Sequence, residues 1–117
     1  MSPRESIRMT SDEVESFLMT RSHIALATLD STGAPDIAIV PSRCEEGHLV
    51  IEVDGRLRDA VDRDPRVCGA AEVCPSYYEL RGVSVHGVAE PDAGGGVTIV
   101  AQQVMSFDFS KIQARPE

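Results

Sequence analysis

Residues 23–40 read HIALATLDSTGAPDIAIV, and this stretch decides the fold. It contains two apolar runs, HIALATL and DIAIV, that have the composition of β-strands. Between the runs, Gly33 and Pro35 are residues typical of a turn. We therefore predict a β-hairpin, and we expect its second strand to end at Pro41.

A short amphipathic helix is predicted just before the hairpin, at residues 10–20 (TSDEVESFLMT). Thr10 and Glu13 stand three positions apart, which is the spacing of a capping box at the start of a helix. The apolar residues that follow at helical spacing are Val14, Phe17 and Leu18. The helix therefore has a defined start and one apolar face.

The sequence after the hairpin predicts four more strands and a second helix. After a turn at 45–47, apolar residues alternate along the strand HLVIEV at 48–53. Leu57, Ala60 and Val61 have helical spacing, and the proline that follows this short helix ends it. The remaining strands are expected at 67–73, 80–89 and 97–107, with a loop at 90–96.

Six strands with one or two short helices, and no alternation of strand and helix, predict a mainly β protein built as a small antiparallel barrel. Gly82 and Gly87, inside the long fifth strand, indicate bulges or close approaches of the backbone. The 117 residues suffice for one core and hence a single domain, 1–117. Its ends, 1–9 and 113–117, are expected to be flexible tails.

The composition excludes several classes of partner. A formal charge of −8 disfavours broad contact with nucleic acid, because proteins that bind it usually carry a basic face. The chain has no apolar run of about 18 residues, and its first residues are polar and charged, so neither a membrane span nor a secretory signal is predicted. We therefore expect a cytoplasmic protein with no nucleic-acid or membrane partner.

No metal site is predicted from the cysteines and histidines. They are Cys44, Cys68, Cys74, His23, His48 and His86. The cysteines are odd in number and lack the two-residue spacing of zinc and redox sites. The histidines lack a partner at the i, i+4 spacing of a metal-binding helix. Reduced buried thiols and surface or strand-packing histidines are the expected roles.

The order of the predicted segments resembles the pyridoxamine 5′-phosphate oxidase-like family of flavin-binding split barrels. After the first helix the segments are LATLDSTGAPDIAIVP, HLVIEV, RLRDAVDRDPRV, YYELRGVSVHGVAEP and SFDFSKI, and the resemblance spans residues 10–112. It implies a six-stranded antiparallel split β-barrel, a homodimer, and FMN bound in grooves that two subunits share. It also implies an oxidoreductase with a small-molecule substrate.

In this family, basic residues at the start of the helix before the DPR motif hold the flavin phosphate. Two registers remain open here. Aligning the DPR motif puts Leu57 and Ala60 where the family has lysine and asparagine, whereas a shortening by one residue puts Arg56 and Arg58 on the two basic positions. Helix-start N–H groups and arginine side chains together form an anion site. Asp54 and Asp59 flank the arginines, and a solvated helix face is the alternative.

The resemblance places further residues beside the cofactor. Residues at the ends of the second and third strands would contact the flavin ring and its tail. Phe107 stands where the family has tryptophan and would wall the site of the other subunit. The residues expected to bind the cofactor are therefore Pro41, Ser42, Arg43, Val53, Asp54, Arg56, Arg58 and Phe107. No catalytic side chain is assigned, because the flavin itself would perform the hydride transfer.

Two alternatives to an FMN-dependent oxidoreductase remain open. The missing lysine and asparagine, the acidic neighbours of the arginines and the short loop at 90–96 favour a non-catalytic dimeric member with a degenerate site and no cofactor. A deazaflavin-dependent reductase would share the fold, but a net charge of −8 offers little to an acidic cofactor tail. The sequence does not define the substrate.

Overall fold

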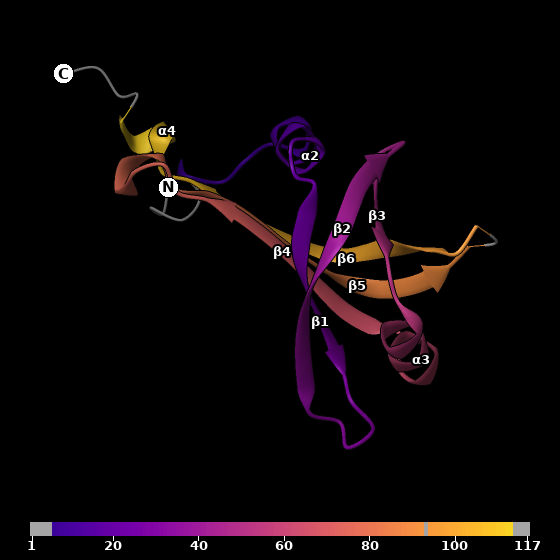
Figure 1. The fold of residues 1–117 in the computed structure, drawn as a ribbon. Helices are drawn as coiled ribbons and strands as arrows, with labels where there is room; N and C mark the ends of the chain where they lie inside the picture. Colours follow the sequence, from indigo (N-terminus) through magenta and orange to yellow (C-terminus); the bar gives the residue numbers. More distant parts are fainter. Residues whose placement is uncertain (1–5, 93, 114–117) are drawn as a thin grey trace.

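The computed structural model describes residues 6–92 and 94–113, and its elements are arranged as Figure 1 shows. The helices are α2 (Ser11–Met19), α3 (Gly55–Arg63) and the single turn α4 (Ser110–Gln113), and a 3-10 turn, η1, spans Tyr77–Glu79. The strands are β1 (His23–Leu29), β2 (Pro35–Glu45), β3 (His48–Glu52), β4 (Arg66–Val73), β5 (Arg81–Pro91) and β6 (Gly96–Asp108).

The strands form a closed barrel in the order β1-β2-β3-β6-β5-β4. Every neighbouring pair is antiparallel, including β1 with β4, which closes the barrel. The interior is aliphatic, and its most deeply buried side chains are Leu26, Ile51, Val97 and Ile99. The predicted mainly β, six-stranded antiparallel barrel is therefore confirmed.

Pro41 does not end the second strand, contrary to the expectation from the sequence. β2 pairs with β1 as far as the His23–Pro41 partners and then pairs with β3 from Ser42 onwards. Pro41 thus lies where β2 changes partners, a position at which a residue without an N–H interrupts no continuous ladder. The strand continues for four more residues, to Glu45.

The long hairpin β5–β6 has the irregularity that its glycines predict. The register shifts between His86 and Gly87. A Cβ at Gly87 would overlap the carbonyl oxygen of Val100, so only glycine allows the backbones to approach this closely. The connecting loop is shorter than the predicted 90–96, because β5 extends to Pro91 and β6 begins at Gly96.

Both nine-residue helices begin and end as their sequences predict. In α2 the backbone N–H of Glu13 donates to Thr10 Oγ1 at 3.2 Å, and Thr10 N–H donates to Glu13 Oε1 at 2.8 Å. In α3 the buried residues are Leu57, Ala60 and Val61. Of the helices in the described part of the chain, none is long and apolar enough to span a bilayer.

One end of the molecule projects beyond the barrel. Strands β4, β5 and β6 run out toward η1 and α4, while α3 lies at the other end of the fold (Figure 1). The extents of 53 × 30 × 25 Å reflect this elongation. Part of the expected N-terminal tail packs here, since Met9 is buried and its N–H donates to Ser106 Oγ. Residues 1–5 and 114–117 of the expected tails lie outside the described residues.

Candidate functional site

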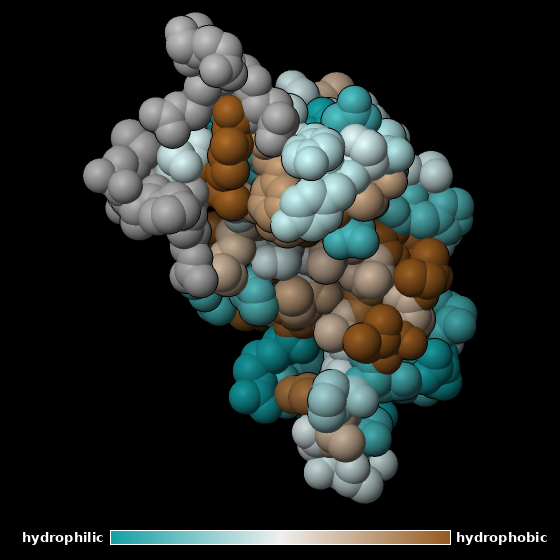
Figure 2. Space-filling model, turned by 90° about the vertical axis from the view of Figure 1, so that its left-hand side faces the viewer, coloured by the Kyte–Doolittle hydropathy of each residue, from teal (hydrophilic) through white to brown (hydrophobic). Residues whose placement is uncertain are grey.

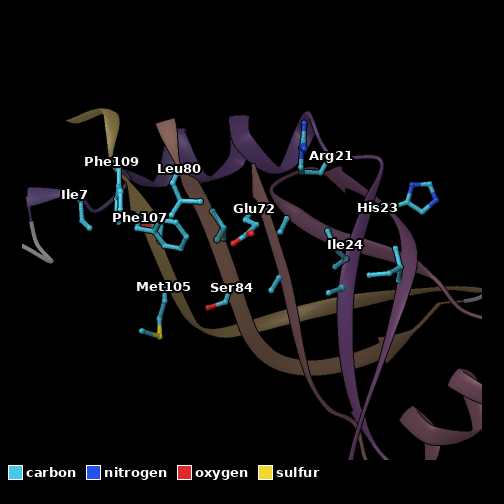
Figure 3. Close-up of a pocket in the computed structure, with 16 residues that line it drawn as sticks. Ile7, Arg21, His23, Ile24, Glu72, Leu80, Ser84, Met105, Phe107 and Phe109 are labelled. Carbon is cyan, nitrogen blue, oxygen red and sulfur yellow. The ribbon is translucent and has the colours of Figure 1, made fainter. Parts of the chain in front are cut away.

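A groove of about 830 Å³ opens between β1 and the projecting ends of β4, β5 and β6, and Figure 3 shows the side chains that line it. Most of its surface is apolar, with walls that include Ile24, Leu80, Val83, Met105, Phe107 and Phe109. The charged or titratable side chains on the groove are Arg21, His23 and Glu72. It therefore combines an apolar surface with few polar groups, which is the usual character of a site for a small organic ligand.

Five residues on the groove belong to one row that crosses the outer face of the sheet. Cross-strand pairing joins Ile39 to Ala25, Ala25 to Ala70, Ala70 to Ser84, and Ser84 to Met105. The two outer members are large and exposed, 68% for Ile39 and 45% for Met105. The three central residues are small, so they leave a shallow floor between the two large apolar side chains.

Phe107 stands at the end of the groove that is formed by the projecting strands. Its ring lies over Gly82, the residue opposite it on β5, and fills the space that a Cβ at position 82 would need. Phe109 continues the aromatic wall, with ring centroids 5.9 Å from Phe107 and 5.6 Å from Tyr77. The predicted site residue Phe107 thus lines the groove.

The predicted phosphate-binding arginines lie on α3 and are engaged in ion pairs. Arg56 Nη1 lies 2.5 Å from Asp36 Oδ2, and Arg58 Nε lies 3.4 Å from Asp62 Oδ1. Asp54 caps the helix, because its Oδ1 accepts a 2.9 Å hydrogen bond from Leu57 N–H. Both arginines keep substantial exposure to solvent.

The residues predicted at the end of the second strand have three different environments. Pro41 is exposed. Ser42 Oγ is buried and has no hydrogen-bond partner among the described residues. Arg43 donates from Nε to Glu45 Oε1 at 2.5 Å, and this hydrogen bond raises the pKa of Arg43. Val53, predicted to end the third strand, directly follows β3 and is half-buried against the core.

The structure therefore separates Phe107 from the other predicted residues. Phe107 lines the groove, whereas the other seven are absent from its lining within the described part of the chain. α3, which carries Arg56 and Arg58, lies at the opposite end of the fold from α4, which follows Phe107 closely (Figure 1). One chain thus does not bring the arginines and Phe107 together.

Several residues of the groove were not identified from the sequence. The alanines of the floor, Ala25 and Ala70, alternate with buried residues along their strands, as in any barrel. Ser84, beside Ala70, and Met105, beside Ser84, come from the two strands that follow β4 in the chain. The row is visible only in the register of the paired strands, because the hydrophobic pattern of a single strand does not show which residues lie beside it.

No protein-family model matches the sequence, and no curated protein is significantly similar to it. Solved structures do match. A conserved hypothetical protein of Mycobacterium tuberculosis has 23% identity over 100% of this chain and 96% of its own, with a TM-score of 0.87. An FAD-binding protein of Mycobacterium smegmatis has 15% identity over 85% of this chain and 94% of its own, with a TM-score of 0.70.

A candidate pyridoxamine 5′-phosphate oxidase of Corynebacterium glutamicum has 15% identity over 86% of this chain and 92% of its own, with a TM-score of 0.69. At these identities the likeness concerns the fold. The resemblance read from the sequence is borne out at that level. The chain has the split-barrel fold of pyridoxamine 5′-phosphate oxidase-like proteins.

Proposed function

We propose that the protein binds FMN in the apolar groove, as a homodimer, and acts as a flavin-dependent oxidoreductase on a small molecule. The observation that carries this proposal is the groove itself, about 830 Å³ of mostly apolar space on the outer face of a split barrel. Known ligand pockets have volumes of about 300–1,000 Å³ and similar linings. The FAD-binding protein of similar fold supports a flavin as the ligand.

The groove has the shape and chemistry that a planar aromatic ring requires. Ala25 and Ala70 leave a shallow floor, and Phe107 provides an aromatic wall at one end. Ser84 on the floor and Arg21 at the rim supply polar groups for the edge of the ring or for a substrate. The residues of the groove therefore fit an isoalloxazine.

The arginines of α3 can bind the flavin phosphate only if their ion pairs with Asp36 and Asp62 break. The Arg56 side chain is 63% exposed and its partner Asp36 is 41% exposed. Exposed ion pairs of this kind contribute about 0–1 kcal/mol each, so a phosphate dianion can compete for the guanidinium. The Ser42 Oγ, also predicted at the cofactor, is buried without a hydrogen-bond partner among the described residues, so a ligand would reach it only after its neighbours moved.

A second copy of the chain would bring the two halves of the site together. Within one chain Phe107 lies on the groove and Arg56 on a helix at the other end of the fold. The face that carries the groove also exposes large apolar residues, among them Ile37, Ile39 and Met105. Figure 2 shows that hydrophobic patches stay exposed on the side of the molecule drawn there. A dimer that covers this face would complete the site.

A bound flavin would supply hydride transfer, and the chain would supply position and environment. The walls of the groove exclude water from one face of the ring. Arg21 and Glu72, at the rim, are placed to orient a polar substrate. The described groove contains no pair of side chains arranged for acid–base or nucleophilic catalysis, which agrees with chemistry performed by the cofactor.

A non-catalytic dimer with a degenerate cofactor site is the second candidate. It is favoured by one observation, namely that aspartates already bind every group predicted to hold the phosphate. Asp36 pairs with Arg56, Asp62 pairs with Arg58, and Asp54 accepts a hydrogen bond at the start of the helix. In that case the groove would serve only as part of the dimer interface.

Titration of the purified protein with FMN, FAD, riboflavin and a deazaflavin separates these possibilities. Quenching of FMN fluorescence and a perturbed visible spectrum at micromolar concentrations are expected. Tighter binding of the deazaflavin than of FMN would identify a deazaflavin as the cofactor. The absence of binding of any of the four at tens of micromolar would favour the degenerate dimer.

A further inference from the structure

Cys68 and His86 form a pair on the outer face of the sheet, next to the groove. They are cross-strand partners on β4 and β5, and Cys68 Sγ lies 3.6 Å from His86 Nε2. The row that contains them runs from Ile37 through Ala27 to Cys68, His86 and Gln103. It is adjacent to the row that forms the floor of the groove. The pair therefore lies within the face that the proposed dimer covers.

The separation of the two atoms is that of two ligands on one tetrahedral metal ion. Zinc lies about 2.3 Å from a thiolate sulfur and about 2.0–2.1 Å from an imidazole nitrogen, so a tetrahedral angle places these ligands about 3.6 Å apart. The observed distance between Cys68 Sγ and His86 Nε2 is 3.6 Å. The separation of these two atoms therefore matches that of two ligands on one zinc ion.

One chain provides only half of the ligands of such a site. The described residues contain no cluster of three or more cysteine, histidine or acidic side chains that could hold a metal. A closed zinc site requires four ligands. In a two-fold symmetric dimer, residues near the axis face their own copies, and β4 is the central strand of the five that carry this face.

We propose that Cys68 and His86 bind zinc together with the same pair from a second copy, in a Cys₂His₂ site at the dimer interface. This inference rests on the dimer of the proposed function but not on flavin binding. The small neighbour Ala27 leaves room for close approach of the partner, and His86 is exposed while Cys68 is half-buried. Each site takes one Zn²⁺, releases the two thiol protons to solvent and forms two Zn–S and two Zn–N bonds.

Zinc titration of the reduced protein tests the proposal. We expect one zinc per two chains for the wild-type protein, measured with a metal-sensitive dye after gel filtration. The C68S and H86Q variants should each lose most of this zinc. The controls C74S and H48Q remove another cysteine and another exposed histidine, and they should retain it. Cobalt in place of zinc should give thiolate-to-metal absorption that C68S abolishes.

Light scattering with and without a chelator distinguishes failure of this inference from failure of the proposed dimer. A dimer that takes up no more zinc than the C68S/H86Q double variant would refute the metal site alone. A monomer that binds no zinc would refute both. One zinc on each monomeric chain would overturn the shared site, whereas a monomer that dimerises on addition of zinc would support it.

Discussion

Phe107 and Gly82 face each other across β5 and β6, and the ring of Phe107 fills the space where a side chain at position 82 would begin. The nearest atoms to an added Cβ are at the far end of the ring, which can move. The aromatic wall of the groove thus depends on the absence of a side chain at position 82 of β5.

Substitution of Gly82 should therefore change the groove more than the stability of the fold. G82A is expected to displace the Phe107 ring and to weaken FMN binding, with a stability loss of about 1 kcal/mol. G87A should cost more, about 3 kcal/mol, because the atoms it meets belong to the backbone of Val100. G55A is the control for stability alone, since a Cβ at Gly55 meets nothing within 4 Å, whereas Gly55 belongs to the helix start proposed to bind the phosphate.

Thermal unfolding of the three glycine variants, and FMN titration of G82A and G87A, give the measurement. The melting temperature should follow the order G55A, G82A, G87A, from highest to lowest. Equal losses in G82A and G87A would show that Phe107 cannot move aside, and unaltered FMN affinity in G82A would place the ring of the cofactor away from Phe107.

The sequence contained enough information to predict the elements that depend on local interactions. The capping box of Thr10 and Glu13 joins residues three positions apart, and the bulge near Gly87 follows from one residue type. The predicted end of the second strand at Pro41 was wrong. The proline is tolerated because β2 changes its partner strand there, and only the assembled sheet shows this change.

The candidate site was less predictable because it depends on register and on ion pairs between distant residues. Arg56 pairs with Asp36, 20 positions away, and Cys68 lies opposite His86, 18 positions away. The hydrophobic pattern of a strand shows which residues face outward but not which residue of the next strand lies beside them. The groove floor and the Cys68–His86 pair could therefore be found only in the folded structure.

The arginines of α3 should affect binding of FMN but not of riboflavin, which lacks the phosphate. R56A and R58A are each expected to weaken FMN binding by about 1–3 kcal/mol, or about fivefold to 150-fold, for each lost charge-assisted contact. R63A is the matched control, on the same helix but outside the predicted site. Fluorescence titration with both flavins measures the difference. A uniform effect on the two ligands, or none, would move the phosphate site elsewhere.

A charge at the centre of the groove floor should separate the proposed dimer. Ala70 lies on β4 between Ala25 and Ser84, and an arginine there would place a charge in an apolar interface. We expect A70R to be a folded monomer by light scattering and circular dichroism, with weakened FMN binding. A34R, in the exposed hairpin turn, should remain dimeric. A dimer in A70R would place the interface on another face.

The acid sensitivity of the fold should depend on Glu13, which joins three segments of the chain. Lys111 Nζ donates to Glu13 Oε1 at 2.7 Å and to the carbonyl oxygen of Arg8 at 2.9 Å. Hydrogen bonds from Lys111 and then from Thr10 lower the pKa of Glu13 from 4.5 to about 2. A carboxylate with a lowered pKa stabilises the fold above its unfolded pKa, and this stabilisation is lost as the pH falls toward the folded value.

The E13Q variant should therefore be less stable than the wild-type protein at neutral pH, and the difference should narrow between pH 4.5 and about 2. The free energy of unfolding in urea, measured for both proteins from pH 7 down to the lowest pH at which they fold, gives this difference. D12N is the control, because it removes a carboxylate from the same turn of α2 while leaving the ion pair between Glu13 and Lys111 in place. A difference in stability between E13Q and wild type that stays constant over this range would show that the contact with Lys111 does not lower the pKa of Glu13 in solution.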